Sequence, residues 1–141
     1  MNTVLVLGDL MVDHYLWGDV NRISPEAPVP VVDISMENKF PGGAGNVVNN
    51  LVSLGCQVKV CSVLGEDAEG VFILEHFNKL GIETRGIICC PGRKTSRKTI
   101  LMARHNHVVR FDMEKIAPLE EDVEKRVINW LEVHVAGMDV V

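Results

Sequence analysis

A carboxylate near the start of the chain is the first side chain whose position suggests chemistry. Thr3 to Leu7 is a continuous β-branched and aliphatic run that ends at Gly8-Asp9, as a fully buried strand does before a polar turn. Asp13 follows this turn, beyond the carboxyl end of the strand, where open α/β sheets bind ligands. Its two oxygens can accept hydrogen bonds from two adjacent hydroxyl groups. The alternative is a turn aspartate that bonds to its own backbone.

A glycine-rich turn offers a second binding element. Gly42 and Gly43 precede a predicted helix over Asn46 to Leu54, so the backbone there can approach a ligand closely. The start of the helix offers unpaired N–H groups, and the Asn46 amide can both donate and accept hydrogen bonds. A dinucleotide-binding loop would need the spacing G-x-G-x-x-G, which is absent. A purely structural turn is the alternative.

Three cationic side chains lie on or beside a predicted hairpin. Its strands are expected at Thr99 to Ala103 and Val108 to Asp112, and the cations are Lys98, Arg104 and Arg110. A phosphate is bound by bidentate Arg contacts or by the point charge of Lys, and we select Lys98 and Arg104 as candidate phosphate ligands. Solvated charges on an edge strand are the alternative.

The pattern of cysteines and histidines argues against a metal site. The cysteines form no C-x-x-C pair and lie in or beside apolar runs, at Cys56, Cys61, Cys89 and Cys90. We expect them to be free and to pack as small hydrophobes in a reducing compartment. His105 and His107 flank an Asn in one turn without a nearby carboxylate or Cys, which predicts a surface loop.

The composition excludes several classes of protein. The chain has 141 residues, of which 47% are hydrophobic and 23% charged, as in one soluble domain. Its formal net charge is -5 without a run of basic residues, so nucleic acid and anionic membrane are poor partners. The longest apolar stretches are far below the roughly 20 residues of a membrane span. With no basic segment ahead of an apolar stretch, a signal peptide is not predicted, and we expect a cytoplasmic protein.

The rest of the chain alternates strands and helices. Gln57 to Val63 predicts a strand parallel to the first, and Asp67 can cap a helix that ends near Leu80. The expected inner stripe of that helix is Val71, Leu74, Phe77 and Leu80. Later elements are a strand at Thr84 to Cys89, a helix with inner face Val123, Val127, Trp130, Leu131 and His134, and a strand beginning at Met138 to Val141. A β/α pattern that stops at a strand start predicts an interrupted fold.

A proline-rich excursion interrupts this alternation. Between Trp17 and Phe40 the sequence turns to prolines and mixed charges, with a short strand expected at Val29 to Ile34. We expect this strand to leave the main sheet for a small lid that spans about 14–40, with 98–112 as its candidate continuation. A short strand with little local protection seeks a partner strand, so we expect a homodimer through the lid. No linker divides residues 1–141, which favours part of a single domain.

Three segments together resemble the N-terminal part of ribokinase-type carbohydrate kinases. They are Gly8 to Asp13, Arg22 to Val32 and Pro41 to Asn46, in this order and spacing. The long middle segment resembles the heptose 7-phosphate kinases in particular. The resemblance covers essentially the whole chain. It implies the N-terminal part of a ribokinase-like α/β fold, a mostly parallel sheet flanked by helices with a small β lid.

The resemblance also implies roles for individual residues. Asp13, Gly42, Gly43 and Asn46 match positions that bind the sugar in the family. Asn46 is not a catalytic base, because an amide cannot take a proton and the family keeps its Gly-Ala-Gly-Asp motif near the C-terminus. We therefore expect no catalytic residue in this chain and no strong binding of the ATP and Mg²⁺ that intact enzymes use.

The implied activity is transfer of the γ-phosphoryl group of ATP to the anomeric hydroxyl of a heptose 7-phosphate. The product would serve synthesis of nucleotide-activated heptose, a lipopolysaccharide core precursor. Without base and anion hole, the chain alone is expected to be inactive. The alternatives are a related kinase for another sugar, favoured if no phosphate-binding cluster forms around Lys98 and Arg104, and a non-catalytic sugar-phosphate binding or dimerisation module.

Overall fold

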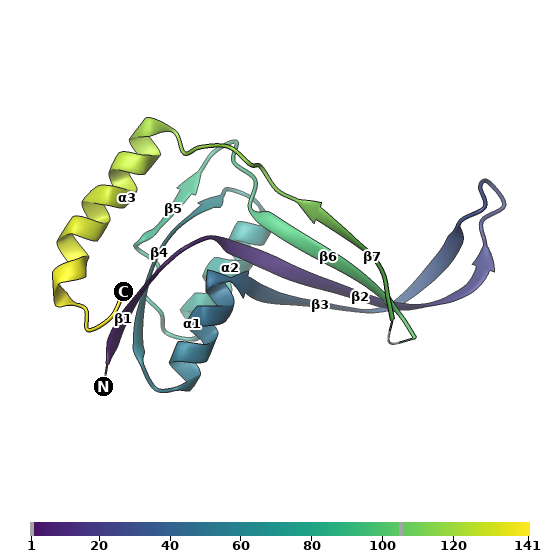
Figure 1. Cartoon of the computed structure of the whole chain (residues 1–141), viewed down its shortest axis with the longest axis horizontal. Helices are drawn as coiled ribbons and strands as arrows, with labels where there is room; N and C mark the ends of the chain where they lie inside the picture. Colours follow the sequence, from purple (N-terminus) through teal and green to yellow (C-terminus); the bar gives the residue numbers. More distant parts are fainter. Residues whose placement is uncertain (1, 105) are drawn as a thin grey trace.

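The computed structural model describes residues 2–104 and 106–141, which form two sheets and three α-helices. The elements in chain order are β1 (Thr3–Leu7), β2 (Leu10–Ile23), β3 (Pro30–Gly43), α1 (Ala44–Ser53), β4 (Gln57–Gly65), α2 (Ala68–Lys79), β5 (Ile87–Cys90), β6 (Ser96–Ala103), β7 (Asn106–Met113), α3 (Glu121–His134) and the 3₁₀ turn η1 (Val135–Gly137). The main sheet has the order β1-β4-β5, and the second sheet has the order β3-β2-β6-β7. Figure 1 shows the second sheet extending away from the main sheet, with a hooked β2–β3 end.

The main sheet is parallel. β1 pairs with β4 from Thr3↔Gln57 to Leu7↔Cys61, and β4 pairs with β5 in the same direction. The prediction of two parallel strands is therefore confirmed. A single parallel bridge joins Val4 to Val140, in the segment where a strand was predicted to begin.

Alternating residues of β4 face two separate cores. Val60 and Leu64 pack with Phe77 of α2, in a cluster that also contains Val48 of α1. Val63 packs on the other side, against Val123 of α3 and its neighbours. Because successive side chains of a strand point to opposite faces, α1 and α2 cover one face and α3 the other, as Figure 1 shows. The predicted arrangement of a sheet flanked by helices is confirmed.

The predicted inner stripe of α2 is confirmed at Leu74 and Phe77 and is wrong at Val71 and Leu80. Val71 and Leu80 are 52% and 43% exposed, whereas Ile73 and Phe77 are fully buried. Gly70 explains the rotation, because a Cβ at this position would press on the carbonyl group at the end of β4. The helix therefore turns its glycine toward the sheet, and the residues three and seven positions later follow it inward.

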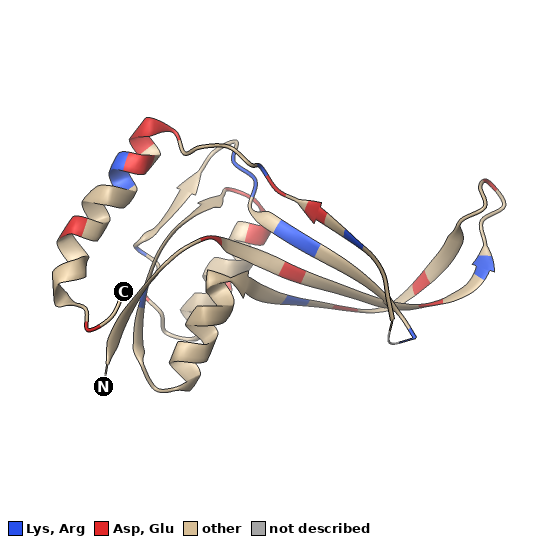
Figure 2. Cartoon of the chain, in the orientation of Figure 1, with Lys and Arg blue, Asp and Glu red and all other residues tan. Residues whose placement is uncertain are grey.

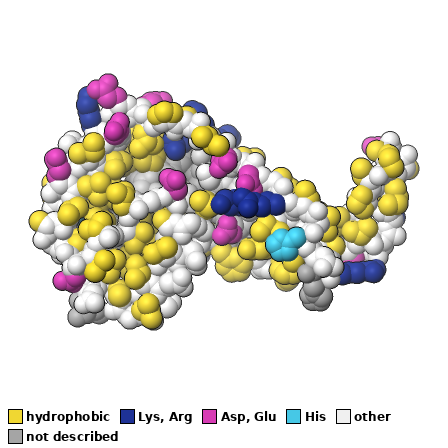
Figure 3. All heavy atoms as spheres, viewed as in Figure 1, with side chains coloured by type: hydrophobic (Ala, Val, Ile, Leu, Met, Phe, Trp, Pro, Cys, Tyr) yellow, Lys and Arg dark blue, Asp and Glu magenta, His cyan; other side chains and the backbone are white. Residues whose placement is uncertain are grey.

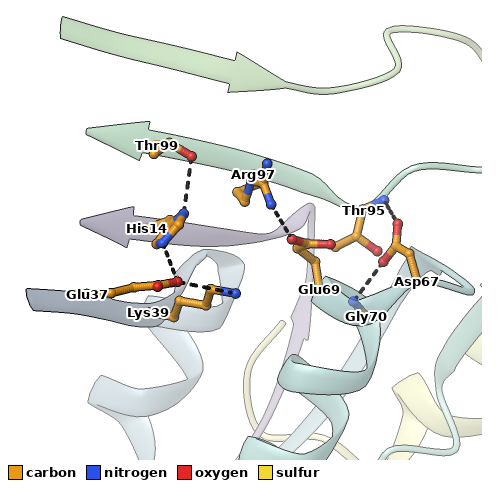
Figure 4. Close-up of polar contacts among 9 residues, drawn as sticks. All are labelled: His14, Glu37, Lys39, Asp67, Glu69, Gly70, Thr95, Arg97 and Thr99. Carbon is orange, nitrogen blue, oxygen red and sulfur yellow. Dashed lines mark hydrogen bonds and ion pairs between the residues drawn. The ribbon is translucent and has the colours of Figure 1, made fainter. Parts of the chain in front are cut away.

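Polar contacts at the start of α2 connect it to β6. Asp67 caps the helix as predicted: the Gly70 N–H donates to Oδ1 at 2.9 Å, and the Thr95 N–H donates to Oδ2 at 2.8 Å. Burial raises the pKa of Asp67, but the backbone hydrogen bonds from Thr95 and Gly70 outweigh it and hold the pKa below its ordinary value. Arg97 and Glu69 add an ion pair of 2.6 Å between largely buried side chains. These contacts join the start of α2 to β6 and to Thr95, the residue before it (Figure 4).

The second sheet is larger than the small lid that the sequence predicts. β2 and β3 run for 14 residues each and pair antiparallel, and β2 also pairs in parallel with β6. As predicted, the segment at Val29 to Ile34 leaves the main sheet, because its strand belongs to β3. The predicted hairpin is confirmed by antiparallel pairing of β6 with β7. β2 is not predicted by the sequence pattern, and β3 ends at Gly43, nine residues beyond the predicted strand end at Ile34.

Charged side chains of both signs are spread along the second sheet, whereas acidic residues gather on the first turn of α3 (Figure 2). The acidic residues are Glu121, Asp122 and Glu124. They lie at the helix end whose dipole favours negative charge. Among the described residues, no helix has both the length and the apolar character that crossing a bilayer requires.

Candidate functional site

One face of the second sheet carries a row of polar side chains. Asp13 on β2 lies opposite Phe40 on β3 and Lys98 on β6, and Lys98 lies opposite Asp112 on β7. Residues directly opposite one another in neighbouring strands share a face of the sheet. We call this side of the second sheet the polar face. Asp13 lies within a strand and not in a turn, which removes the alternative of a turn aspartate.

Gly42 leaves the space that the Asp13 carboxylate fills. A Cβ atom at Gly42 would lie 2.6 Å from Cγ of Asp13 and 2.7 Å from its Oδ1, closer than such atoms approach in proteins. Gly43 has φ 57° and caps α1, a left-handed conformation that glycine adopts without strain. Asn46 follows in the first turn of α1. The structure therefore places the predicted residues Asp13, Gly42, Gly43 and Asn46 where β2, β3 and α1 meet.

An open cavity of about 510 Å³ lies on the polar face. Its lining residues are Asp13, Tyr15, Trp17, Asn38, Phe40, Pro41 and Asn46. The Tyr15 ring lies 6.4 Å from that of Trp17 and meets Phe40 edge-on at 6.2 Å, measured between ring centroids. Carboxylate and amide groups beside an aromatic wall suit a ligand with several hydroxyls and an apolar face. The aromatic residues were not among the predicted site residues, although Tyr15 and Trp17 are the alternate positions after Asp13 on one strand.

Arg110 and Asp112 form a bidentate ion pair beside this cavity. Nε of Arg110 donates to Oδ1 of Asp112 at 2.8 Å, and Nη2 donates to Oδ2 at 2.6 Å. The hydrogen bond from Arg110 lowers the pKa of Asp112, and the charge of Lys98 acts in the same direction. The same bond raises the pKa of Arg110, with a smaller contribution from the charge of Asp13. Lys98 and Arg110 are thus cations whose fields reach the carboxylates of the polar face.

The structure separates Lys98 from Arg104. The two residues are six positions apart along β6 and its turn, which corresponds to roughly 20 Å at about 3.3 Å per residue. The Arg104 side chain is 73% exposed, and its Nε lies 4.0 Å from Oδ1 of Asp19. The predicted cluster around Lys98 and Arg104 therefore does not form within one chain. Arg110 lies opposite Ile100, one row from Lys98, so these two cations lie on neighbouring strands of the polar face. His105 lies outside the described residues.

A second cavity of about 550 Å³ opens at the carboxyl ends of β1 and β4. Leu10 lines this cavity, three residues before Asp13 on β2, and the two cavities share no lining residue. Positive charge comes from Arg93, Lys94 and Lys115. Open α/β sheets bind ligands at the carboxyl edge of their strands. The arrangement offers room for a second group next to a ligand held at Asp13.

Fold and site together define a class of protein: an α/β protein that presents a face suited to hydroxyl groups beside the carboxyl edge of a parallel sheet. Residues 1–140 match the family described as pfkB family carbohydrate kinase. The chain therefore belongs to the pfkB family of carbohydrate kinases, and the ribokinase-like fold implied by its motifs is confirmed.

The relatives of the chain are much longer proteins. The bifunctional protein HldE of Trichlorobacter lovleyi is 53% identical over 137 residues, which cover 97% of this chain and 28% of that protein. The bifunctional protein HldE of Wolinella succinogenes is 45% identical over 139 residues, covering 99% of this chain and 29% of that protein. A putative sugar kinase from Clostridium perfringens superposes with a TM-score of 0.68 at 22% identity, over 94% of this chain and 41% of that one. The chain spans somewhat more than a quarter of the length of the two HldE proteins.

Proposed function

We propose that residues 1–141 are the N-terminal, acceptor-binding part of one sugar-kinase domain whose acceptor is a heptose 7-phosphate. The observation that carries this proposal is the Asp13 carboxylate seated over Gly42, in a cavity that Asn46 also lines. Carboxylate and amide oxygens suit sugar hydroxyls, and the nearby cations suit a phosphate. The HldE relatives and the segment Arg22 to Val32 favour heptose over other sugars. In this proposal the lid comprises about residues 14–40 and 98–112.

The proposed reaction moves the γ-phosphoryl group of ATP to the anomeric hydroxyl, giving a 1,7-bisphosphate and ADP. Asp13 and Asn46 hold the sugar so that this hydroxyl faces the neighbouring cavity, and such positioning supplies much of the rate enhancement in phosphoryl transfer. Among the described residues, no group of three or more His, Cys, Asp or Glu could hold a metal ion. Residues 1–141 also contain no Gly-x-Gly-Asp sequence. Because the family's Gly-Ala-Gly-Asp motif is not among residues 1–141, we assign the catalytic base to a part of the polypeptide outside this chain.

Recognition of the 7-phosphate tests the assignment. In the full-length polypeptide that the gene encodes, Arg110→Ala is expected to weaken binding of heptose 7-phosphate by about 10- to 100-fold, the value of a lost charged contact. Binding of unphosphorylated heptose should be unchanged. Arg104→Ala removes the same charge from an exposed turn and is expected to alter either affinity by less than about twofold. Isothermal titration calorimetry with both sugars gives the four affinities.

Two results would contradict this assignment. A loss of heptose 7-phosphate binding with Arg104→Ala alone would move the phosphate to the β6–β7 turn. An equal loss for both sugars with Arg110→Ala would show that Arg110 does not recognise the phosphate. The second result would favour a kinase for another sugar, because the polar face would then lack a phosphate-binding pair.

The proposal includes a homodimer formed through the second sheet. β3 is an edge strand, and exposed apolar side chains gather on the hooked β2–β3 end (Figure 3). These are Ile23, Val29, Ile34 and Met36. Arg22 lies nine residues along β2 from Asp13, roughly 30 Å away, so the heptose-kinase segment is far from the pocket of its own chain. Light scattering is expected to give twice the chain mass, and Ile34→Glu to give a monomer; a monomeric wild type at high concentration would refute the dimer.

A further inference from the structure

A polar network with a buried histidine and threonine and a half-exposed glutamate crosses three strands, on the side of the second sheet opposite the polar face. His14 on β2 lies between Glu37 on β3 and Thr99 on β6 (Figure 4). Its Nε2 is 2.7 Å from Oε1 of Glu37, and its Nδ1 is 3.4 Å from Oγ1 of Thr99. Lys39 Nζ stands 3.8 Å from the same Glu37 oxygen. One imidazole ring therefore links the three strands that carry most of the polar face.

The burial of His14 and Thr99 limits the roles that the network can have. His14 is 8% exposed and Thr99 is 1% exposed. A neutral imidazole has one donor and one acceptor, so Nε2–H donating to Glu37 leaves Nδ1 to accept the Thr99 hydroxyl. Carboxylate, imidazole and hydroxyl stand in the order of a hydrolase triad, but no substrate can reach the Thr99 hydroxyl at 1% exposure. A role in positioning is left, because buried polar groups that satisfy each other favour one arrangement of the strands.

Each member of the network is next in sequence to a residue of the polar face. The pairs are Asp13–His14, Glu37–Asn38 and Lys98–Thr99. Successive side chains of a strand point to opposite faces. A shift of one strand by one residue would therefore move the polar-face residue of its pair to the opposite face and bring the other member to the polar face. β3 is an edge strand with polar residues on both faces, so its hydrophobic pattern alone specifies the register weakly. The contact between His14 and Glu37 supplies the missing constraint.

We propose that His14 is a positioning residue for the sugar site: its contacts to Glu37 and Thr99 hold β3 and β6 in register with β2. Asp13, Asn38 and Lys98 thereby meet on the opposite face. The proposal rests on the proposed function, because it takes a sugar phosphate to be the ligand of that face.

The test compares His14 variants in the full-length polypeptide. His14→Phe keeps the ring size and removes both hydrogen bonds, and His14→Gln can still donate to Glu37. We expect His14→Phe to weaken binding of heptose 7-phosphate by about tenfold or more, as for a lost, partly buried hydrogen bond to a charged group, with the KM for ATP unchanged. His14→Gln should restore affinity to within about threefold of wild type. Val123→Ala, in the core beneath α3, controls for a general loss of stability.

Calorimetry and thermal unfolding of each variant separate the outcomes. A folded His14→Phe with wild-type affinity, or an equal loss of affinity in Val123→Ala, would overturn the positioning role. Failure of His14→Gln to restore affinity would do the same. If His14→Phe does not fold, Thr99→Val removes only the longer contact, and unchanged affinity there would overturn the proposal. If the wild type binds another sugar instead of heptose 7-phosphate, the proposed function fails, and the same variants test His14 with that sugar.

Discussion

Asp13→Ala in the full-length polypeptide is expected to abolish measurable binding of heptose 7-phosphate at concentrations that saturate the wild type. The Asp13 carboxylate lines the cavity together with the amides of Asn38 and Asn46, and it supplies the negative charge of this lining. Each hydrogen bond lost between a sugar hydroxyl and a charged acceptor costs about 1 to 3 kcal/mol, and two adjacent hydroxyls can be held. Calorimetric titration with the sugar phosphate measures the loss. Titration with ATP should give the wild-type affinity.

Two further variants show whether the charge or the position of Asp13 matters. Asp13→Asn keeps the shape but turns one acceptor into a donor, so an intermediate affinity is expected. Asp33→Ala removes an exposed carboxylate from the distal part of β3 and should leave binding unchanged. Sugar affinity in Asp13→Ala equal to that in Asp33→Ala would remove Asp13 from the site.

Gly42→Ala is expected to reduce sugar affinity almost as much as Asp13→Ala, although it removes no polar group. The new Cβ would lie 2.7 Å from Oδ1 of Asp13, so the carboxylate must move out of its present position. Gly42 does not have a positive φ, which means that the backbone itself tolerates alanine. The loss should therefore appear in binding more than in stability. Calorimetry and thermal unfolding of the same preparation distinguish the two effects.

Gly137→Ala is the matched control for this substitution. Among the described residues other than its two chain neighbours, none has an atom within 4 Å of a Cβ at Gly137, and the φ of Gly137 is not positive. The control should behave as wild type in both measurements. If Gly42→Ala also binds sugar phosphate like the wild type, the carboxylate is free to relocate, and the fixed geometry of Asp13 is not needed for binding.

The main sheet could be predicted from the sequence because its strands are buried on both faces. Thr3 to Leu7 is a short, continuous β-branched and aliphatic segment, and glycines follow the helices beside the two strands. Gln57 to Val63 contains polar residues, but four of its seven residues are apolar: Val58, Val60, Cys61 and Val63. β2 could not be predicted in the same way. Both faces of β2 carry large apolar side chains: one face has Leu10, Val12 and Leu16, and the other has Met11, Tyr15 and Trp17. The alternation of apolar and polar residues that identifies a half-buried strand is therefore absent from this segment. β3 continues through Glu37, Asn38 and Lys39 because an edge strand tolerates polar residues on both faces.

The site residues could be predicted where they stand at the end of a strand or the start of a helix. They could not be predicted where the pairing of strands determines which side chains share a face. Asp13, Gly42, Gly43 and Asn46 stand at the ends of elements, so their neighbourhood follows from the order of strand, turn and helix. The choice between Arg104 and Arg110 depends on the register of β6 with β7, which contains a shift between Leu101 and Met102. The sequence does not reveal such a bulge.

Phosphorus NMR of the full-length polypeptide with MgATP and heptose 7-phosphate tests the central claim most directly. The account predicts a second phosphoester signal, from the anomeric position, that grows as ADP forms while the 7-phosphate signal is retained. Residues 1–141 alone should give no such signal, because the proposal assigns the catalytic base to another part of the polypeptide. Phosphorylation of ribose, fructose or a nucleoside without turnover of heptose 7-phosphate, or ADP formation by residues 1–141 alone, would contradict the account.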